Sequence, residues 1–144
     1  MKDIYQNFDE SFHRFLFKTM VEEDWIAKFS DELKGITKLE LRIIRYISEH
    51  PNSINRDILK ALDIPDSTLT SALNRLEKRD ITKRVINNED RRSYILELTE
   101  HGKKVHEEHC KADLLVAKKI LDILENDEDK KSFARFFEKI SIDL

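Results

Sequence analysis

The stretch Ile64–Gly102, IPDSTLTSALNRLEKRDITKRVINNEDRRSYILELTEHG, changes its hydrophobic period once and so predicts two kinds of structure. Its first part predicts a helix over about residues 65–79, because apolar side chains recur at three- and four-residue spacing: Leu69, Ala72, Leu73 and Leu76. From Ile81 onward β-branched and alternating residues take over, and a polar loop at residues 87–91 divides two runs. This second part predicts a β-hairpin.

The flanking sequence predicts further helices. Thr37 and Glu40 form the capping-box pattern at the start of one helix, which His50-Pro51 ends. A short helix over about 55–62 follows, and Pro65 suits the first position of the helix after it. Amphipathic helices are also expected over about 3–29, 100–125 and 126–142. The predicted fold is mainly α with a small β-hairpin wing, a winged helix-turn-helix flanked by N- and C-terminal helices.

The side of helix 65–79 that faces away from its apolar stripe carries residue types suited to DNA. It consists of Asp66, Ser67, Thr68, Thr70, Ser71, Asn74, Arg75 and Lys78. Short hydroxyl side chains allow a close approach to phosphates and base edges, and Asn74 and Arg75 have the donor geometry for adenine and guanine respectively. An ordinary solvent-facing helix is the alternative, although such helices more often carry Glu/Lys pairs.

The hairpin and the end of the helix add basic side chains. Arg91 or Arg92 can place a guanidinium in a narrow minor groove, and Asp90 can hold the loop by pairing with an arginine. Phosphate contacts are predicted for three further residues: Lys78, Lys83 and Arg84. The chain has 144 residues and a net charge of -3, yet Arg75–Arg92 holds seven basic residues against four acidic ones. Phosphate binding needs only such a local patch, although a solvated mixed-charge surface fits the same count.

Four short motifs within the quoted stretch carry a family resemblance: Ser67-Thr68-Leu69-Thr70, Leu76-Glu77-Lys78, Asp90-Arg91-Arg92 and Leu98-Thr99-Glu100-His101-Gly102. With them, the chain resembles the MarR (multiple antibiotic resistance regulator) family. Members commonly have Ser where Pro65 stands and Gly where Asp80 stands, and Asp80 can adopt a left-handed conformation at modest cost.

The resemblance implies a homodimer on a pseudo-palindromic operator, usually a repressor of nearby genes that a small-molecule effector relieves. It implies a single domain over 1–144, with dimerisation helices in 1–34 and 100–144 and a DNA-binding region in 35–99. The sequence independently supports dimerisation by its clusters of apolar side chains near the two ends: Phe8, Phe12, Phe15 and Phe17, and Phe133, Phe136, Phe137, Ile140 and Ile142. Some of these residues are expected to serve an intramolecular core instead.

Three kinds of effector site are conceivable. His106 and Cys110 can share one face of a helix as metal ligands, but no clear third and fourth ligand accompanies them. Redox sensing by Cys110 is disfavoured by acidic neighbours such as Glu107. A ligand pocket near the first helix and Tyr46 cannot be separated from core by sequence. We therefore expect no resident metal or cofactor.

Composition excludes several other functions. With Gly35 and Gly102 as its two glycines, the chain contains no Gly-rich phosphate loop. No recognisable nucleophile and base accompany His106, so we expect no enzyme and no catalytic residue. The single cysteine, the absence of a long apolar run and the polar N-terminus MKDIYQNFDE predict a cytoplasmic protein. A winged-helix protein-interaction module without DNA binding remains the alternative, which the net negative charge would suit.

Overall fold

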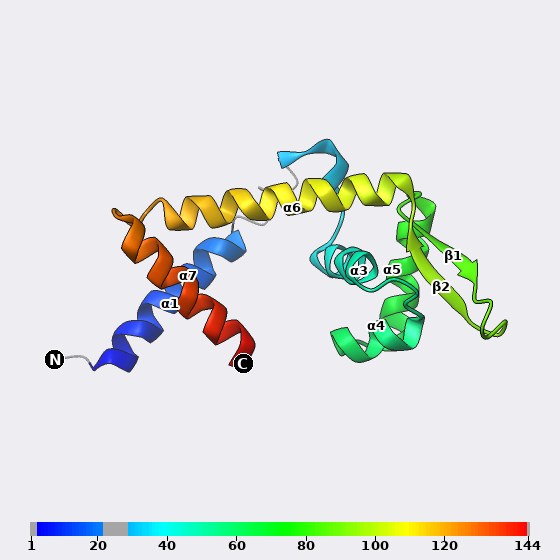
Figure 1. Ribbon diagram of the computed structural model, residues 1–144, viewed down its shortest axis with the longest axis horizontal. Coiled ribbons are helices and arrows are strands. Elements are labelled where there is room, and N and C mark those ends of the chain that lie inside the picture. Colours follow the sequence, from blue (N-terminus) through cyan, green and yellow to red (C-terminus); the bar gives the residue numbers. More distant parts are fainter. Residues whose placement is uncertain (1–2, 22–28, 144) are drawn as a thin grey trace. The chain divides into compact units, whose positions relative to one another are not determined.

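The computed structural model describes residues 3–21 and 29–143 (Figure 1). Its elements are α1 (Ile4–Val21), the 3₁₀ helix η1 (Asp31–Leu33), α3 (Lys38–Glu49), α4 (Asn55–Leu62), α5 (Asp66–Lys78), β1 (Thr82–Ile86), β2 (Tyr94–Leu98), α6 (Glu100–Leu121) and α7 (Asp127–Asp143). They fall into two compact units that divide within α6, between His109 and Cys110. The predicted architecture, mainly helical with one hairpin, is confirmed.

Helix α3 begins with the predicted capping box. The Thr37 hydroxyl accepts from the Glu40 amide at 3.2 Å, and the Glu40 carboxylate accepts from the Thr37 amide at 2.8 Å. The helix then buries Leu41, Ile43, Ile44 and Ile47, whereas Leu39 is half-buried. Glu40 is buried as well, which the apolar pattern does not indicate.

Helices α4 and α5 are joined by a tight turn. Asp63 ends α4 in the left-handed region at φ 50°. Pro65 lies at the N-cap of α5 and not at its first helical position, because its ψ of 149° is extended. The Pro65 carbonyl accepts from the amides of Thr68 and Leu69, both at 3.1 Å, and so starts the helix at Asp66.

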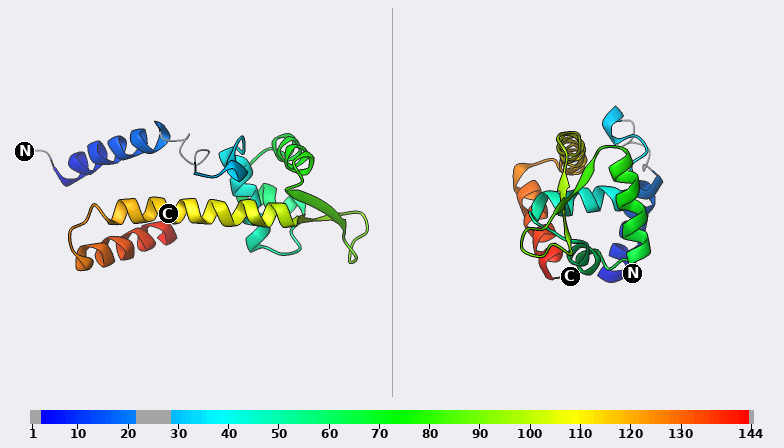
Figure 2. Two further views of the ribbon diagram at one scale, coloured as in Figure 1. Left: turned by 90° about the horizontal axis from the view of Figure 1, so that it is seen from above. Right: turned by 90° about the vertical axis from the view of Figure 1, so that its right-hand side faces the viewer.

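The hairpin is a two-stranded antiparallel sheet in which Thr82 pairs with Leu98 and Ile86 with Tyr94. The Ser53 carbonyl accepts from the Leu96 amide at 2.9 Å, which fastens the loop before α4 to the outer edge of β2. Figures 1 and 2 show the two strands extending beyond helices α3–α5 as a narrow ribbon. This ribbon is the wing of a winged helix-turn-helix.

A single apolar core holds α3, α4, α5 and the hairpin together. Its side chains are at most 9% exposed: Leu41, Ile43, Ile44, Ile47, Ile58, Leu69, Ala72, Leu73, Leu76, Ile81, Leu96 and Leu98. Burial of one such aliphatic side chain contributes about 1.5–3 kcal/mol. The predicted inward face of α5 is therefore confirmed, and it fixes which side of α5 faces solvent.

The start of α6 packs tightly against the end of this core. The Thr99 hydroxyl accepts from the Gly102 amide at 3.0 Å, so Thr99 caps the helix. Gly102 has no room for a side chain, because a Cβ there would lie 2.0 Å from the Ile81 carbonyl oxygen. α6 ends at Leu121, earlier than the expected residue 125.

Helices α1 and α7 each expose apolar residues. On α1, Ile4, Tyr5, Phe8 and Phe17 are between 65% and 81% exposed. No residue of α7 is buried, although the Asn126 side chain caps it through the Asp129 amide at 2.8 Å. The expected extension of the first helix through Trp25 lies outside the described residues. None of the helices in residues 3–21 and 29–143 is long and apolar enough to cross a membrane.

Candidate nucleic-acid interface

Helix α5 presents its predicted polar face to solvent. Ser67, Thr70, Ser71, Asn74, Arg75 and Lys78 are exposed, and Thr68 is half-buried. The opposite face is locked into the core by Leu69, Ala72, Leu73 and Leu76, each 0% exposed. A helix anchored along one side and polar along the other is the arrangement that lets a recognition helix enter the major groove.

Arg75 is held by a carboxylate from another helix. Its Nε donates to Oε1 of Glu40 at 2.7 Å, and the Glu40 side chain is 4% exposed whereas that of Arg75 is 54% exposed. Burial by itself raises the pKa of Glu40, but hydrogen bonds from Thr37 and Arg75 outweigh burial and leave that pKa below its ordinary value. Glu40 is therefore charged at neutral pH.

Asn74 and two predicted phosphate ligands also contact partners within the protein. Arg84 donates from Nη1 to Oε2 of Glu77 at 2.8 Å and from Nη2 to Oδ1 of Asn74 at 3.4 Å. Lys83 lies with its Nζ 3.1 Å from Oε2 of Glu97. Lys83 and Arg84 must therefore share their charge with a carboxylate, and Arg84 engages the Asn74 oxygen that an adenine contact would need.

The wing turn is stabilised by backbone contacts of Asp90 and not by the expected pairing of its side chain with an arginine guanidinium. Oδ1 of Asp90 accepts from the Arg92 amide at 3.0 Å, and its carbonyl accepts from the Ser93 amide at 2.9 Å. A carboxylate two residues ahead of an amide forms this local turn more readily than it orders a long side chain. Arg91 and Arg92 remain exposed at the tip.

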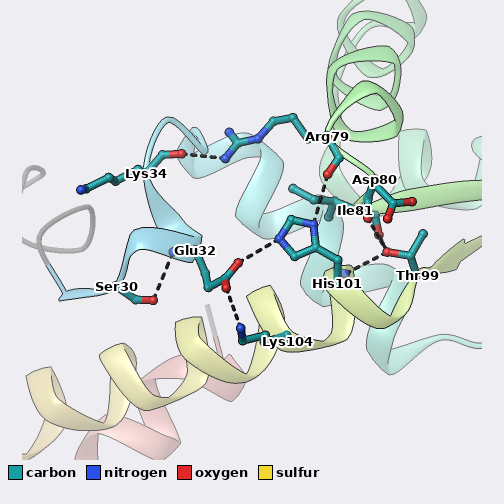
Figure 3. Close-up of polar contacts among 10 residues, drawn as sticks. Ser30, Glu32, Lys34, Arg79, Asp80, Ile81, Thr99, His101 and Lys104 are labelled. Atoms are coloured by element: carbon teal, nitrogen blue, oxygen red, sulfur yellow. Dashed lines mark hydrogen bonds and ion pairs between the residues drawn. The ribbon is translucent and has the colours of Figure 1, made fainter.

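A second polar cluster, which sequence reasoning missed, lies at the end of α5 and the start of α6 (Figure 3). Nε2 of His101 lies 2.9 Å from Oε2 of Glu32, and Nδ1 lies 3.1 Å from the Arg79 carbonyl. Nζ of Lys104 lies 2.7 Å from Oε1 of Glu32. Hydrogen bonds from Lys104 and then from His101 lower the pKa of Glu32.

Arg79 extends this cluster to the loop after η1. Its Nη2 donates to the Lys34 carbonyl at 2.7 Å. The two ring nitrogens of His101 therefore face two different acceptors, the Glu32 carboxylate and the Arg79 carbonyl. Together these contacts join η1, the end of α5 and the start of α6, through partners that lie far apart in sequence.

The structure offers little for the other expected sites. Within residues 3–21 and 29–143, no three His, Cys, Asp or Glu side chains come together as a metal site requires, so His106 and Cys110 lack further ligands there. An open groove of about 530 Å³ lies between the end of α3, the hairpin and the start of α6, with Ile47, Lys83 and Leu96 among its lining. Tyr46, the expected pocket residue, does not line it.

Comparison with known proteins agrees with this geometry. FabT of Streptococcus pneumoniae, in a crystal structure in complex with DNA, is 26% identical and superposes with a TM-score of 0.76 over 95% of this chain and 97% of its own. A mutant of MepR from S. aureus, bound to an oligodeoxyribonucleotide, is 22% identical with a TM-score of 0.61, over 92% of this chain and 98% of that one; it supports the fold alone. The fold and the interface define a winged helix-turn-helix protein.

Sequence comparison points to one family of regulators. Residues 36–94 match the model of the MarR family. YwhA of Bacillus subtilis, an uncharacterised HTH-type transcriptional regulator, is 28% identical over 134 residues, 92% of this chain and 91% of the relative. In sequence and fold the chain is thus similar to DNA-binding transcriptional regulators of the MarR family.

Proposed function

We propose that this protein acts as a homodimeric, sequence-specific regulator that places α5 in the major groove and the wing in the minor groove. The observation that carries the proposal is the exposed polar face of α5 beside an exposed, doubly basic wing tip. Both features lie on one rigid core, as docking of two elements into adjacent grooves requires.

The side chains divide by role. Ser67, Thr68, Thr70, Ser71, Asn74 and Arg75 face the bases of the major groove. Lys78, Lys83 and Arg84 bind phosphates, and Arg91 or Arg92 enters the minor groove. Asp90 holds the wing turn through the Arg92 amide. Base contacts give sequence preference, whereas phosphate contacts give affinity that falls with salt.

Dimerisation uses the terminal regions 1–34 and 100–144, and DNA binding uses 35–99. Support comes from the apolar residues that each helix exposes in one chain, among them Phe8 on α1 and Phe136 and Phe137 on α7, all between 57% and 65% exposed. Apolar surface of this kind is typical of an interface between subunits. Two-fold symmetry then sets two recognition helices about one DNA turn apart on a pseudo-palindromic operator.

In the cell, the dimer represses nearby genes from the cytoplasm until a small-molecule effector releases it, and it has no enzymatic activity. Similarity to MarR-family regulators supports the regulatory role. The runner-up is a protein-interaction module that does not bind DNA, which the net charge of -3 would suit.

Fluorescence anisotropy tests the proposal. Labelled duplex from upstream of the protein's own gene is titrated against a scrambled duplex at several salt concentrations, with Arg92→Ala alongside. We expect tighter, salt-sensitive binding to the upstream duplex and its loss in the variant. Absence of binding to either duplex at low salt would favour the interaction module instead.

A further inference from the structure

Arg75 and Glu40 form an asymmetric pair across two helices. Glu40 is on α3, buried beneath α5, while the Arg75 side chain is half-exposed on the face of α5 assigned to DNA. An ion pair that only stabilises the packing of two helices does not require either side chain to be exposed. The exposed partner here carries the hydrogen-bond donors that bind guanine most often.

The contact uses a particular edge of the guanidinium. Glu40 accepts a hydrogen bond from Nε of Arg75. Within the described residues, Nη1 and Nη2 of Arg75 donate to no protein acceptor. The two terminal nitrogens are the fork that makes parallel bonds to O6 and N7 of guanine. The contact at Nε therefore leaves Nη1 and Nη2 available for DNA, and it limits the rotamers that the Arg75 side chain can adopt.

Glu40 is itself fixed on its other side. Its Oε2 accepts from the Thr37 amide at 2.8 Å while Oε1 holds Arg75 at 2.7 Å, so both carboxylate oxygens have defined partners. The capping box that begins α3 is therefore continuous with the side chain that faces DNA. Because Thr37 fixes the Glu40 carboxylate at the start of α3, the position of that helix determines where Nε of Arg75 is held.

We propose that Glu40 is a positioning residue for sequence readout, which orients the Arg75 fork toward a base edge and restrains it from neighbouring phosphates. The inference rests on the proposed function and adds a determinant that does not itself touch DNA. The carboxylate also offsets the charge of Arg75, which lowers affinity for DNA of any sequence while it preserves hydrogen-bond geometry.

Glu40→Gln removes the charge and one acceptor together, and two readouts tell the effects apart. Glutamine places an NH2 donor where one carboxylate oxygen stood, so it cannot accept from both Thr37 and Arg75 in the same arrangement. The probes are a duplex that the wild-type protein selects from a randomised library and a scrambled duplex of the same composition. We expect the ratio of the two affinities to fall about fivefold or more. Affinity for the scrambled duplex should rise, and its salt slope should steepen by about one unit.

Two control variants isolate other causes. Thr37→Ala removes the hydroxyl half of the capping box and lowers stability, yet leaves the carboxylate on Arg75, so the affinity ratio should persist. Glu97→Gln removes one negative charge beside Lys83, and should raise affinity for both duplexes alike. If Glu40→Gln does not fold, Glu40→Asp withdraws the carboxylate by one methylene while keeping its charge, and the same loss of ratio is expected.

A double-mutant cycle tests whether Glu40 acts through Arg75. In an Arg75→Ala background, Glu40→Gln should leave the affinity ratio unchanged, because the group that it positions is gone. An equal loss of ratio in both backgrounds, or an unchanged ratio in Glu40→Gln alone, would overturn the inference and leave the proposed function standing. A wild-type protein that selects no sequence from the library would overturn the proposed function itself.

Discussion

The winged helix buries most of its apolar side chains within one chain, whereas the two terminal helices, α1 and α7, expose many of theirs. In the winged helix, the core residues of α3, α5 and the hairpin are at most 9% exposed within one chain. On α7 no residue is buried, and Phe136 and Phe137 are 57% and 60% exposed. The first region buries a core of its own and turns the polar face of α5 outward. The second leaves apolar side chains exposed, as the proposed dimer would require.

The largest effect is expected at the exposed apolar residues of α7. Phe136→Glu places a charge on the apolar face, and should weaken dimerisation by about 2–4 kcal/mol if that face is the interface core. Sedimentation of the variant should show monomer at concentrations where the wild type is dimeric. Lys131→Glu adds a glutamate in another part of the same helix and should leave the dimer intact. A dimeric Phe136→Glu protein would show that α7 is not an interface.

The completeness of the winged helix is tested at Gly102. Gly102→Ala forces the Ile81 carbonyl away from a Cβ that would otherwise lie 2.0 Å from it, and should destabilise the fold by about 1–3 kcal/mol or more. Thermal unfolding measures the loss. Gly35→Ala is the matched comparison: its φ of 69° is strained for alanine, but the nearest atom is 3.5 Å away, at the end of Arg79. A smaller loss is therefore expected at Gly35, and the reverse order would contradict the packing described.

Asp80 tests local strain at the junction of α5 and β1. Its φ of 55° favours glycine, and Asp80→Gly should stabilise the protein by about 0.5–1 kcal/mol. The Thr99 hydroxyl bonds the Asp80 carbonyl, which a glycine retains. Chemical denaturation measures the gain, and a loss of stability would mean that the Asp80 side chain has a role that its conformation does not reveal.

The smallest expected effect is the pH dependence contributed by Glu32. Hydrogen bonds from Lys104 and His101 lower its pKa in the folded protein below the ordinary value of 4.5. The stabilisation is therefore present above pH 4.5 and is lost as pH falls through the folded pKa. Glu32→Gln should flatten this part of the stability profile. Glu107→Gln, an exposed glutamate of α6, is the control, and equal profiles for the two variants would exclude a role for the Glu32 cluster.

Features that depend on local order were predictable from sequence. The capping box of Thr37 and Glu40, the inward face of α5 and the hairpin each follow from the spacing of neighbouring residues. The family motifs of α5 and the wing indicated the function, because they lie within one contiguous stretch.

Contacts between distant residues were not predictable. Arg75 and Glu40 are 35 residues apart, and Glu32 and His101 are 69 apart. No spacing rule joins such pairs, because tertiary packing alone decides which side chains meet. The same reason explains why Lys83 and Arg84 were predicted as phosphate ligands without their carboxylate partners, Glu97 and Glu77.

The proposed dimer, with a winged helix in each subunit, has one direct readout on DNA. Hydroxyl-radical footprinting of the wild-type protein on a selected duplex should show two symmetric protected regions, about one helical turn apart. Phe136→Glu should weaken both together, since each winged helix depends on its partner for affinity. A single protected region in the wild type, or no protection at all, would contradict the account of a dimer that reads DNA through two recognition helices.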